Sequence, residues 1–208
     1  MPFLGARGMV AALFVLPDGP YGHAPDVDVW DVRRDARRYA GPHPVVAHPP
    51  CERWGRYWHG GPSAHVRRVK GDDGGCFAAA LAAVRAYGGV LEHPADSAAW
   101  RAHGLLLPPR DGGWVNADFA GGWTCCVDQG HYGHPAQKST WLYAVGMPLP
   151  SLRWGRARGT RRLDDGCHPG WREAGRGVRR ARISARECLE TPAAFRDVLL
   201  SMAASCRS

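Results

Sequence analysis

The sharpest chemical signal in the sequence is a cysteine that directly follows two prolines. Cys51 comes after Pro49-Pro50 and after an apolar stretch, Pro44–His48, that is typical of a buried strand. Because the prolines restrict the backbone ahead of the cysteine, the thiol is expected to project rigidly from a strand end. A nucleophile needs its direction of attack set in this way. The alternative, a loop cysteine packed against Trp54, stays open.

A carboxylate occupies a comparable place in a second segment. Glu92 ends an apolar, strand-like stretch and is followed by His93-Pro94. A charged group at the end of a buried strand is unfavourable unless it is paired or used in chemistry. Glu92 is therefore the candidate partner of Cys51, and a salt bridge to one of the many arginines is the alternative.

The elements around these residues form a plausible strand–helix–strand unit. The alanine-rich stretch Cys76–Tyr87 is the clearest helix in the chain and ends at a pair of glycines. It connects strand 44–48 to strand 90–92, and such crossovers are right-handed and give parallel neighbours. Cys51 and Glu92 are therefore expected at the carboxyl edge of one sheet, where open α/β folds keep their sites.

The rest of the chain completes an α/β pattern. Further strands are predicted at Met9–Leu16, Val27–Trp30, Trp123–Asp128 and Ser139–Val145. Further helices are predicted at Asp31–Tyr39, from 97 to 103, and over Thr191–Met202, with Thr191 as cap and Pro192 as first helical residue. Residues 105–121 are expected to form a long loop. The fold class is α/β, with a Rossmann-like open sheet that is mostly parallel and has an antiparallel edge.

Composition divides the chain into three parts and suggests its partners. We expect an α/β catalytic domain over 1–146, a basic arginine-rich insertion or linker over 147–190, and a C-terminal helix over 191–208 that packs back on the catalytic domain. The formal net charge of +8 favours an anionic partner, a nucleic acid or a nucleotide. Seven cysteines, two of them adjacent, suggest an intracellular protein without a disulfide framework. The apolar run Met9–Leu16 is too short to span a membrane.

Three segments together resemble the cytosine-C5 DNA methyltransferase family. The family's proline-proline-cysteine motif is similar to Pro49-Pro50-Cys51, with Trp54 at the position of the family's aromatic residue. Its glutamate-asparagine motif is similar to Glu92-His93, and its later tyrosine-glycine-x-proline-glutamine loop is similar to Tyr132–Lys138. Order and rough spacing agree over about residues 44–146.

The resemblance implies a pyrimidine-modifying enzyme. In the family's mechanism Cys51 would add to C6 of the pyrimidine, and Glu92 would hydrogen-bond or protonate N3, so that C5 becomes nucleophilic. Addition requires a thiolate, and Arg53 and His48 are the neighbours that could lower the pKa of the thiol. Loop 129–138 is expected beside the same cleft. The residues expected to bind the substrate are Pro50, Trp54, His93, Gln129, His134 and Lys138.

The resemblance also implies S-adenosylmethionine as the methyl donor, held by a Gly-rich turn between a strand and a helix. Here the connection from Leu16 to Val27 has roughly ten residues and three prolines, so it cannot carry the helix of a parallel crossover. The sequence therefore predicts a shortened cofactor half, with weak or absent binding of S-adenosylmethionine in the family's usual mode. Asp31 is the candidate ribose ligand, and a helix cap is its alternative role.

A zinc-dependent enzyme is one alternative. Cys126, His131 and His134 have a spacing that could bind zinc, as could His48 with Cys51. Catalytic zinc needs about three protein ligands and an open position, and the sequence has no paired C-x-x-C motif. His131 and His134 could equally line a cleft or cap a loop.

A non-catalytic nucleic-acid-binding protein is the other alternative. Residues 153–186 contain 11 arginines, with Trp154 and Trp171 interleaved. Such a stretch could follow phosphates and stack on bases. It could also be a solvated basic linker. A binding protein would need neither Cys51 nor Glu92, so replacing each separates the two classes.

Overall fold

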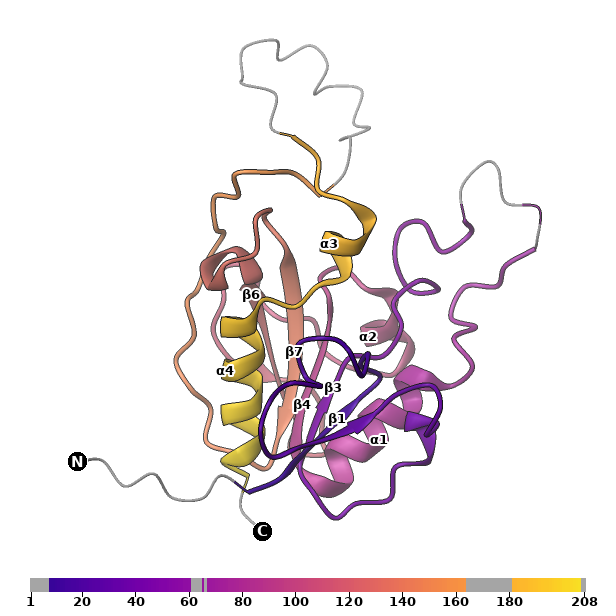
Figure 1. The fold of residues 1–208 in the computed structure, drawn as a ribbon, viewed down its shortest axis with the longest axis vertical. Helices are drawn as coiled ribbons and strands as arrows, with labels where there is room; N and C mark the ends of the chain where they lie inside the picture. The colour runs from indigo at the N-terminus through magenta and orange to yellow at the C-terminus, as the bar shows by residue number, and fades with distance from the viewer. Residues whose placement is uncertain (1–7, 61–64, 66, 164–180, 207–208) are drawn as a thin grey trace.

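The computed structural model describes residues 8–60, 65, 67–163 and 181–206 of the chain. These residues form one mixed sheet with a helix packed on each face (Figure 1). The strands are β1 (Val10–Leu13), β2 (Val27–Trp30), β3 (Val45–Ala47), β4 (Gly89–Pro94), β5 (Val115–Asn116), β6 (Trp123–Asp128) and β7 (Ser139–Val145). The helices are α1 (Cys76–Tyr87), α2 (Ala98–Ala102), α3 (Ala185–Leu189) and α4 (Ala193–Ala204).

The strands lie in the order β2-β1-β3-β4-β7-β6-β5. The first four are parallel, and β7, β6 and β5 form an antiparallel edge. This mixed α/β sheet is compatible with the expected open Rossmann-like architecture. The chain moves outward from β1 to β2 and then returns to β3 on the other side of β1. In open α/β sheets, ligands bind outside the carboxyl ends of the strands at such a reversal.

Each face of the sheet has its own apolar core and its own covering helix. Phe77 and Val84 of α1 lie in one core with Leu91 of β4. Phe195 of α4 lies in the other core with Val90. Alternate residues of a strand point to opposite faces, so one strand serves both cores. We name these the α1 face and the α4 face.

The connection between β1 and β2 contains turns and no helix across residues 14–26, as the sequence predicts. The two strands nevertheless pair in parallel, with Val10 opposite Val27. Because parallel crossovers are right-handed, a helix in this connection would cover the face opposite to α1. That face is covered by α4, which contacts β1, β3 and β4. Arg196 of α4 also donates to the carbonyl of Pro20 in the connection, at 2.8 Å.

Several predicted elements have the expected bounds. Helix 76–87 matches α1, and the strands 123–128 and 139–145 match β6 and β7. The strands predicted at 44–48 and 90–92 are parallel neighbours, β3 and β4, so the carboxyl ends that carry Cys51 and Glu92 do meet at one edge. This arrangement confirms the premise of the site prediction.

Three local expectations were wrong. Only a 3₁₀ turn, Ala36–Arg38, forms within the predicted helix Asp31–Tyr39, because Asp35 has a left-handed φ of 51° that ends any α-helical run. Thr191 does not cap α4, since Pro192 is the N-cap residue and no side chain caps the helix. The expected loop 105–121 contains the short edge strand β5, which pairs with β6.

The structure describes only part of the basic stretch 147–190. Leu152 is buried in the α4-face core, and α3 follows at 185–189. Residues 164–180 lie outside the described part of the chain, and with them Trp171. The division into a catalytic domain, an insertion and a C-terminal tail stays a prediction.

Candidate functional site

Glu92 is the centre of a buried group of hydrogen bonds at the carboxyl edge of the sheet. Its side chain is nearly inaccessible, with 8% of the residue exposed. Oε2 lies 2.9 Å from Nδ1 of His48. Oε1 accepts from Nε2 of Gln129 at 3.1 Å and from the hydroxyl of Thr140. Both carboxylate oxygens are therefore held by neutral or positively charged donors.

Four neighbouring strands bring these groups together. His48 directly follows β3, and Gln129 directly follows β6. Thr140 is the second residue of β7 and is paired with Pro94 of β4. Glu92 lies two residues from the end of β4, between the neighbouring strands β3 and β7. By alternation from Val90, its side chain points to the α4 face.

His48 extends the group to the β1–β2 connection. Its Nε2 lies 2.7 Å from the hydroxyl of Tyr21, and the two rings are 5.2 Å apart at their centroids. Both ring nitrogens of His48 therefore have a partner. Tyr21 is buried, and burial raises the pKa of its phenol well above the ordinary value, with the charge of Glu92 acting in the same direction. The phenol therefore stays protonated.

The hydrogen bonds decide the charge of Glu92. Burial is the largest influence and raises the pKa of this carboxyl. The bond to His48, the charges of His48 and Lys138 and the bond to Thr140 together outweigh burial and lower the pKa to about 2. Glu92 is therefore a carboxylate in the free protein at neutral pH.

Cys51 lies in the same electrostatic neighbourhood. The residue is partly buried, and burial is the main reason that the pKa of its thiol is raised. The negative charge of Glu92 raises this pKa further, whereas Lys138 opposes the shift. The expectation that Arg53 and His48 lower the pKa of the thiol was therefore wrong for the free protein, because a buried thiolate beside a carboxylate is unfavourable.

Lys138 is a cation whose charge acts on both of these groups. Its ammonium donates to the carbonyl of Glu190 at 2.9 Å. Burial lowers the pKa of Lys138, and the negative charges of Glu92 and of ionised Cys51 oppose that shift. Lys138 therefore favours negative charge on both groups, as expected for a residue of loop 129–138 beside the site.

Two of the predicted substrate-binding residues lie on the other face. His93 is fully buried on the α1 face, with its ring 5.3 Å from that of Phe77. The ring centroids of Trp54 and Phe77 are 6.0 Å apart, and the indole N–H of Trp54 donates to the carboxylate of Asp73 at 2.8 Å. Pro50 is exposed. Its backbone acts on the pKa of His93 and is not among the causes of the pKa shift of Glu92. The structure therefore brings Gln129 and Lys138 to Glu92, and it separates Trp54 and His93 from it.

His134 and Asp31 have local structural partners. Nδ1 of His134 lies 2.7 Å from the carbonyl of Ala136, and Nε2 lies 3.2 Å from the carbonyl of Glu187. The first contact lies within loop 129–138, and the second ties the loop to α3. Asp31 accepts from the backbone of Arg33 at 2.9 Å. This contact closes a local turn, and the 3₁₀ element that follows is capped by Asp35, so Asp31 is not the helix cap that was the alternative to ribose binding.

The first half of the sheet does not offer the family's site for S-adenosylmethionine. No helix follows β1 among residues 14–26, so no helix N-terminus points at a ligand there. The chain instead turns tightly, and a Cβ at Gly22 would lie 1.7 Å from the carbonyl oxygen of Pro17. These residues do not fit the cofactor in the family's usual mode.

The described residues also bear on the zinc alternative. Among them, no group of three or more His, Cys, Asp or Glu side chains is arranged to hold a metal ion. Cys126 lies in the α1-face core, whereas His131 contacts the carbonyl of Gly155 at 3.2 Å. The described cysteines are free thiols: Cys51, Cys76, Cys125, Cys126, Cys188 and Cys206.

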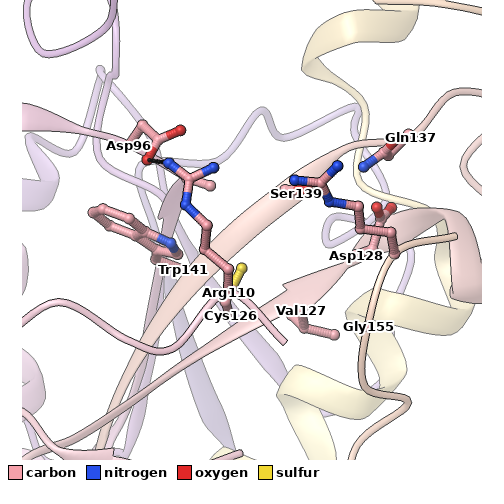
Figure 2. A pocket seen from close by; sticks show the side chains of 11 residues that line it. Asp96, Arg110, Cys126, Val127, Asp128, Gln137, Ser139, Trp141 and Gly155 are labelled. Atoms are coloured by element: carbon pink, nitrogen blue, oxygen red, sulfur yellow. Dashed lines mark hydrogen bonds and ion pairs between the residues drawn. The ribbon is translucent and has the colours of Figure 1, made fainter. Parts of the chain in front are cut away.

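Two adjoining cavities lie along the same edge of the sheet. A cavity of about 350 Å³ is bordered by Lys138, Pro94 and Cys188. It shares four lining residues with a smaller cavity of about 80 Å³, shown in Figure 2. In that view the ion pair of Arg110 with Asp96 lies on one side of the smaller cavity and Asp128 lies on the other. The two cavities run from Lys138 toward the antiparallel edge, and neither Cys51 nor Glu92 lines them.

No protein-family model matches the chain, and a search of curated proteins finds no matching relative. Across the described residues, no helix has the length and apolar character needed to cross a membrane.

Sequence reasoning did not include Tyr21 or Thr140 in the site. Thr140 had a signal, because its position in the predicted strand 139–145 puts it at the edge that faces Glu92. Tyr21 had none, since its place depends on how a proline-rich turn folds back over β3. The sequence relates His48 to Cys51, either as a neighbour that lowers the pKa of the thiol or as a second zinc ligand, whereas the structure pairs His48 with Glu92.

Proposed function

We propose that this protein is an enzyme that modifies a pyrimidine base. Cys51 is the nucleophile, and Glu92 is the group that hydrogen-bonds to or protonates N3 of the ring. The observation that carries the proposal is the position of both residues after the ends of adjacent parallel strands, β3 and β4, where the charge of Glu92 acts on the pKa of the Cys51 thiol. The resemblance to cytosine-C5 DNA methyltransferases assigns the same roles to the same residues.

The chemistry follows from the properties of the ring. The thiol of Cys51 first gives its proton to water, and its sulfur then forms a bond to C6 while the electron pair of the C5–C6 double bond moves toward C5. Glu92 must take up a proton when the base binds; as a carboxylic acid it then gives that proton to N3 and neutralises the charge that reaches this atom, while Lys138 stabilises the thiolate. C5 can then take a proton from water and lose its original hydrogen, after which elimination of the thiol restores the ring. This exchange balances without any other reactant.

Exchange at C5 provides the direct test. Single-stranded and duplex DNA, RNA and free cytidine nucleotides are incubated in heavy water, and deuterium at C5 is measured by mass spectrometry. We expect exchange with at least one substrate, and none with Cys51→Ala. Cys76→Ala is the matched control, since this partly buried cysteine begins α1. A 5-fluoropyrimidine in the exchanging substrate should give a protein adduct that maps to Cys51. Absence of both exchange and adduct with every substrate would contradict the proposal.

The methyl donor is a separate prediction. Because the β1–β2 connection lacks a helix, we expect calorimetry to show weak or absent binding of S-adenosylmethionine and of its demethylated product. Micromolar binding that is lost in Asp31→Ala would show that a rebuilt loop holds the cofactor and would extend the proposal to methyl transfer.

Nucleic-acid binding without catalysis is distinguished in the same samples. The +8 charge supports an anionic partner in either case. If Cys51→Ala and Glu92→Gln bind DNA or RNA as the unmodified protein does, and the unmodified protein exchanges no C5 hydrogen, then the binding alternative holds.

A further inference from the structure

His48 connects Glu92 to a third group, and the connection has a chemical consequence. Nδ1 of His48 is 2.9 Å from Glu92, and Nε2 is 2.7 Å from the hydroxyl of Tyr21. A histidine with one nitrogen on a carboxylate and the other on a hydroxyl is fixed in orientation. Nδ1 therefore faces Glu92, and any proton that leaves Nδ1 goes to that carboxylate.

The reaction at a cytosine ring requires such a proton. N3 of cytosine carries a lone pair and no hydrogen, so a carboxylate cannot donate to it. Glu92 is a carboxylate in the free protein, because His48, Lys138 and Thr140 stabilise its charge. The proton for N3 must therefore reach Glu92 from a neighbour when the base binds.

The groups that face Glu92 differ in what they can give. Gln129 and Thr140 donate hydrogen bonds but do not release protons at neutral pH. Burial keeps the phenol of Tyr21 protonated. Lys138 donates to the carbonyl of Glu190, and among the described hydrogen bonds none joins its ammonium to Glu92. The remaining titratable neighbours are Cys51, which is the nucleophile, and His48.

We infer that His48 supplies the proton that Glu92 delivers to N3, and that Tyr21 holds the His48 ring in the orientation that allows it. The inference rests on the proposed function. The proton moves from Nδ1 of His48 to Oε2 of Glu92, and the carboxyl proton passes to N3 as the Cys51–C6 bond forms. The step therefore begins from a His48 ring with a hydrogen on both nitrogens and leaves a neutral ring, in which Nε2 keeps its hydrogen and donates it to the hydroxyl oxygen of Tyr21. When Cys51 is eliminated, the proton returns by the same route.

The origin of Tyr21 makes this device specific to the shortened fold. Tyr21 comes from the connection between β1 and β2, which has turns instead of a crossover helix. It packs in the α4-face core, and Arg196 and Asp197 of α4 are the other charged groups that influence it. The same compact turn that does not fit the family's cofactor thus positions the histidine beside the carboxylate.

The first arm of the test does not depend on activity. The titration of the Glu92 carboxyl is followed by carbon-detected NMR in the unmodified protein and in His48→Asn. We expect an acid midpoint near 2 in the unmodified protein, since the pKa of Glu92 is lowered to about 2, and a clearly higher midpoint in the variant. An unchanged midpoint would overturn the inference. His48→Gln is measured as well, in case the asparagine variant does not fold.

The second arm measures exchange of C5 hydrogen as a function of pH. His48→Asn should lower the rate by about 100-fold or more at neutral pH, as for loss of a general acid, while binding of the substrate is kept. The residual rate should rise as pH falls, because Glu92 then takes its proton from water. Tyr21→Phe should give a smaller loss with the same change in pH profile. His23→Asn, an exposed histidine of the same connection, is the matched control.

The outcomes separate the two proposals. If the unmodified protein exchanges no C5 hydrogen on any substrate, the proposed function fails. If it does exchange and His48→Asn stays within two-fold at every pH, the inference about His48 fails and the proposed function stands.

Discussion

Glu92 and His93 are consecutive residues of one strand, yet they lie in opposite kinds of surroundings. Their exposures are 8% and 0%, so both are removed from solvent. Glu92 points to the α4 face and has three hydrogen-bonding partners: His48, Gln129 and Thr140. His93 points to the α1 face among the rings of Phe77 and Trp100, and neither of its ring nitrogens has a hydrogen bond of ordinary geometry.

The difference shows that burial alone does not identify a site. On the α1 face a titratable ring is kept neutral, since burial is the main cause that lowers the pKa of His93 to about 4. On the α4 face a charge is kept, because donors converge on Glu92. A retained and paired charge at a sheet edge is what chemistry can use. A neutral histidine among aromatic rings serves as a packing residue.

The largest expected effect comes from removing the charge. Glu92→Leu leaves His48, Gln129 and Thr140 without their common acceptor, and the loss of one member of a buried pair destabilises by about 3–5 kcal/mol. Urea unfolding at pH 7.5 measures this loss. His93→Leu is the matched control: its ring nitrogens make no hydrogen bond of ordinary geometry, so an apolar residue of similar size should change stability by less than about 1 kcal/mol. Equal losses in the two variants would show that the two faces do not differ as described.

The second effect is a loss of folding stability in acid, which occurs over a different pH range for His93 than for Glu92. The pKa of folded His93 is about 4, against 6.5 for an ordinary histidine. As pH falls, His93 is therefore protonated in the unfolded chain before it is protonated in the folded protein. The stability that neutral His93 contributes is lost between pH 6.5 and 4, by up to about 3 kcal/mol. The pKa of folded Glu92 is about 2, against 4.5, so its contribution is lost at lower pH, from 4.5 toward 2.

His93→Leu sharpens this difference. Thermal unfolding as a function of pH should become flatter above pH 4.5 in the variant and should keep its fall below pH 4.5. Burial also lowers the pKa of His103 on the same face, so part of the slope above pH 4.5 should remain. A variant with the full slope above pH 4.5 would contradict the assignment of that slope to His93.

The same comparison explains how far the sequence predicted the site. Strand ends, the helix at 76–87 and the parallel pairing depend on local patterns of apolar residues, and these predicted the edge that holds Cys51 and Glu92. The face to which each side chain points follows from strict alternation within β4, so the separation of His93 from Glu92 was available from the sequence. The contact of Tyr21 with His48 was not, because a turn with three prolines has no periodicity to follow.

The smallest expected effect compares the helices that begin beside the two faces. Ser97 caps α2, with its hydroxyl accepting from the backbone of Ala99 at 3.1 Å. Ser97→Ala should therefore destabilise by about 1 kcal/mol, the usual loss for an N-cap serine. Thr191 does not cap α4, whose N-cap residue is Pro192 and which has no side-chain cap. Thr191→Ala should change stability by less than about 0.5 kcal/mol, as for a surface substitution away from a cap.

Paired urea titrations resolve this difference, because both substitutions remove a hydroxyl near a helix start and only one removes a hydrogen bond. If Thr191→Ala were as destabilising as Ser97→Ala, then α4 would be anchored at its N-terminus by Thr191. The position of α4 on the face that contains Glu92 would then depend on Thr191, in addition to the packing of Phe195 and Leu199 in the α4-face core.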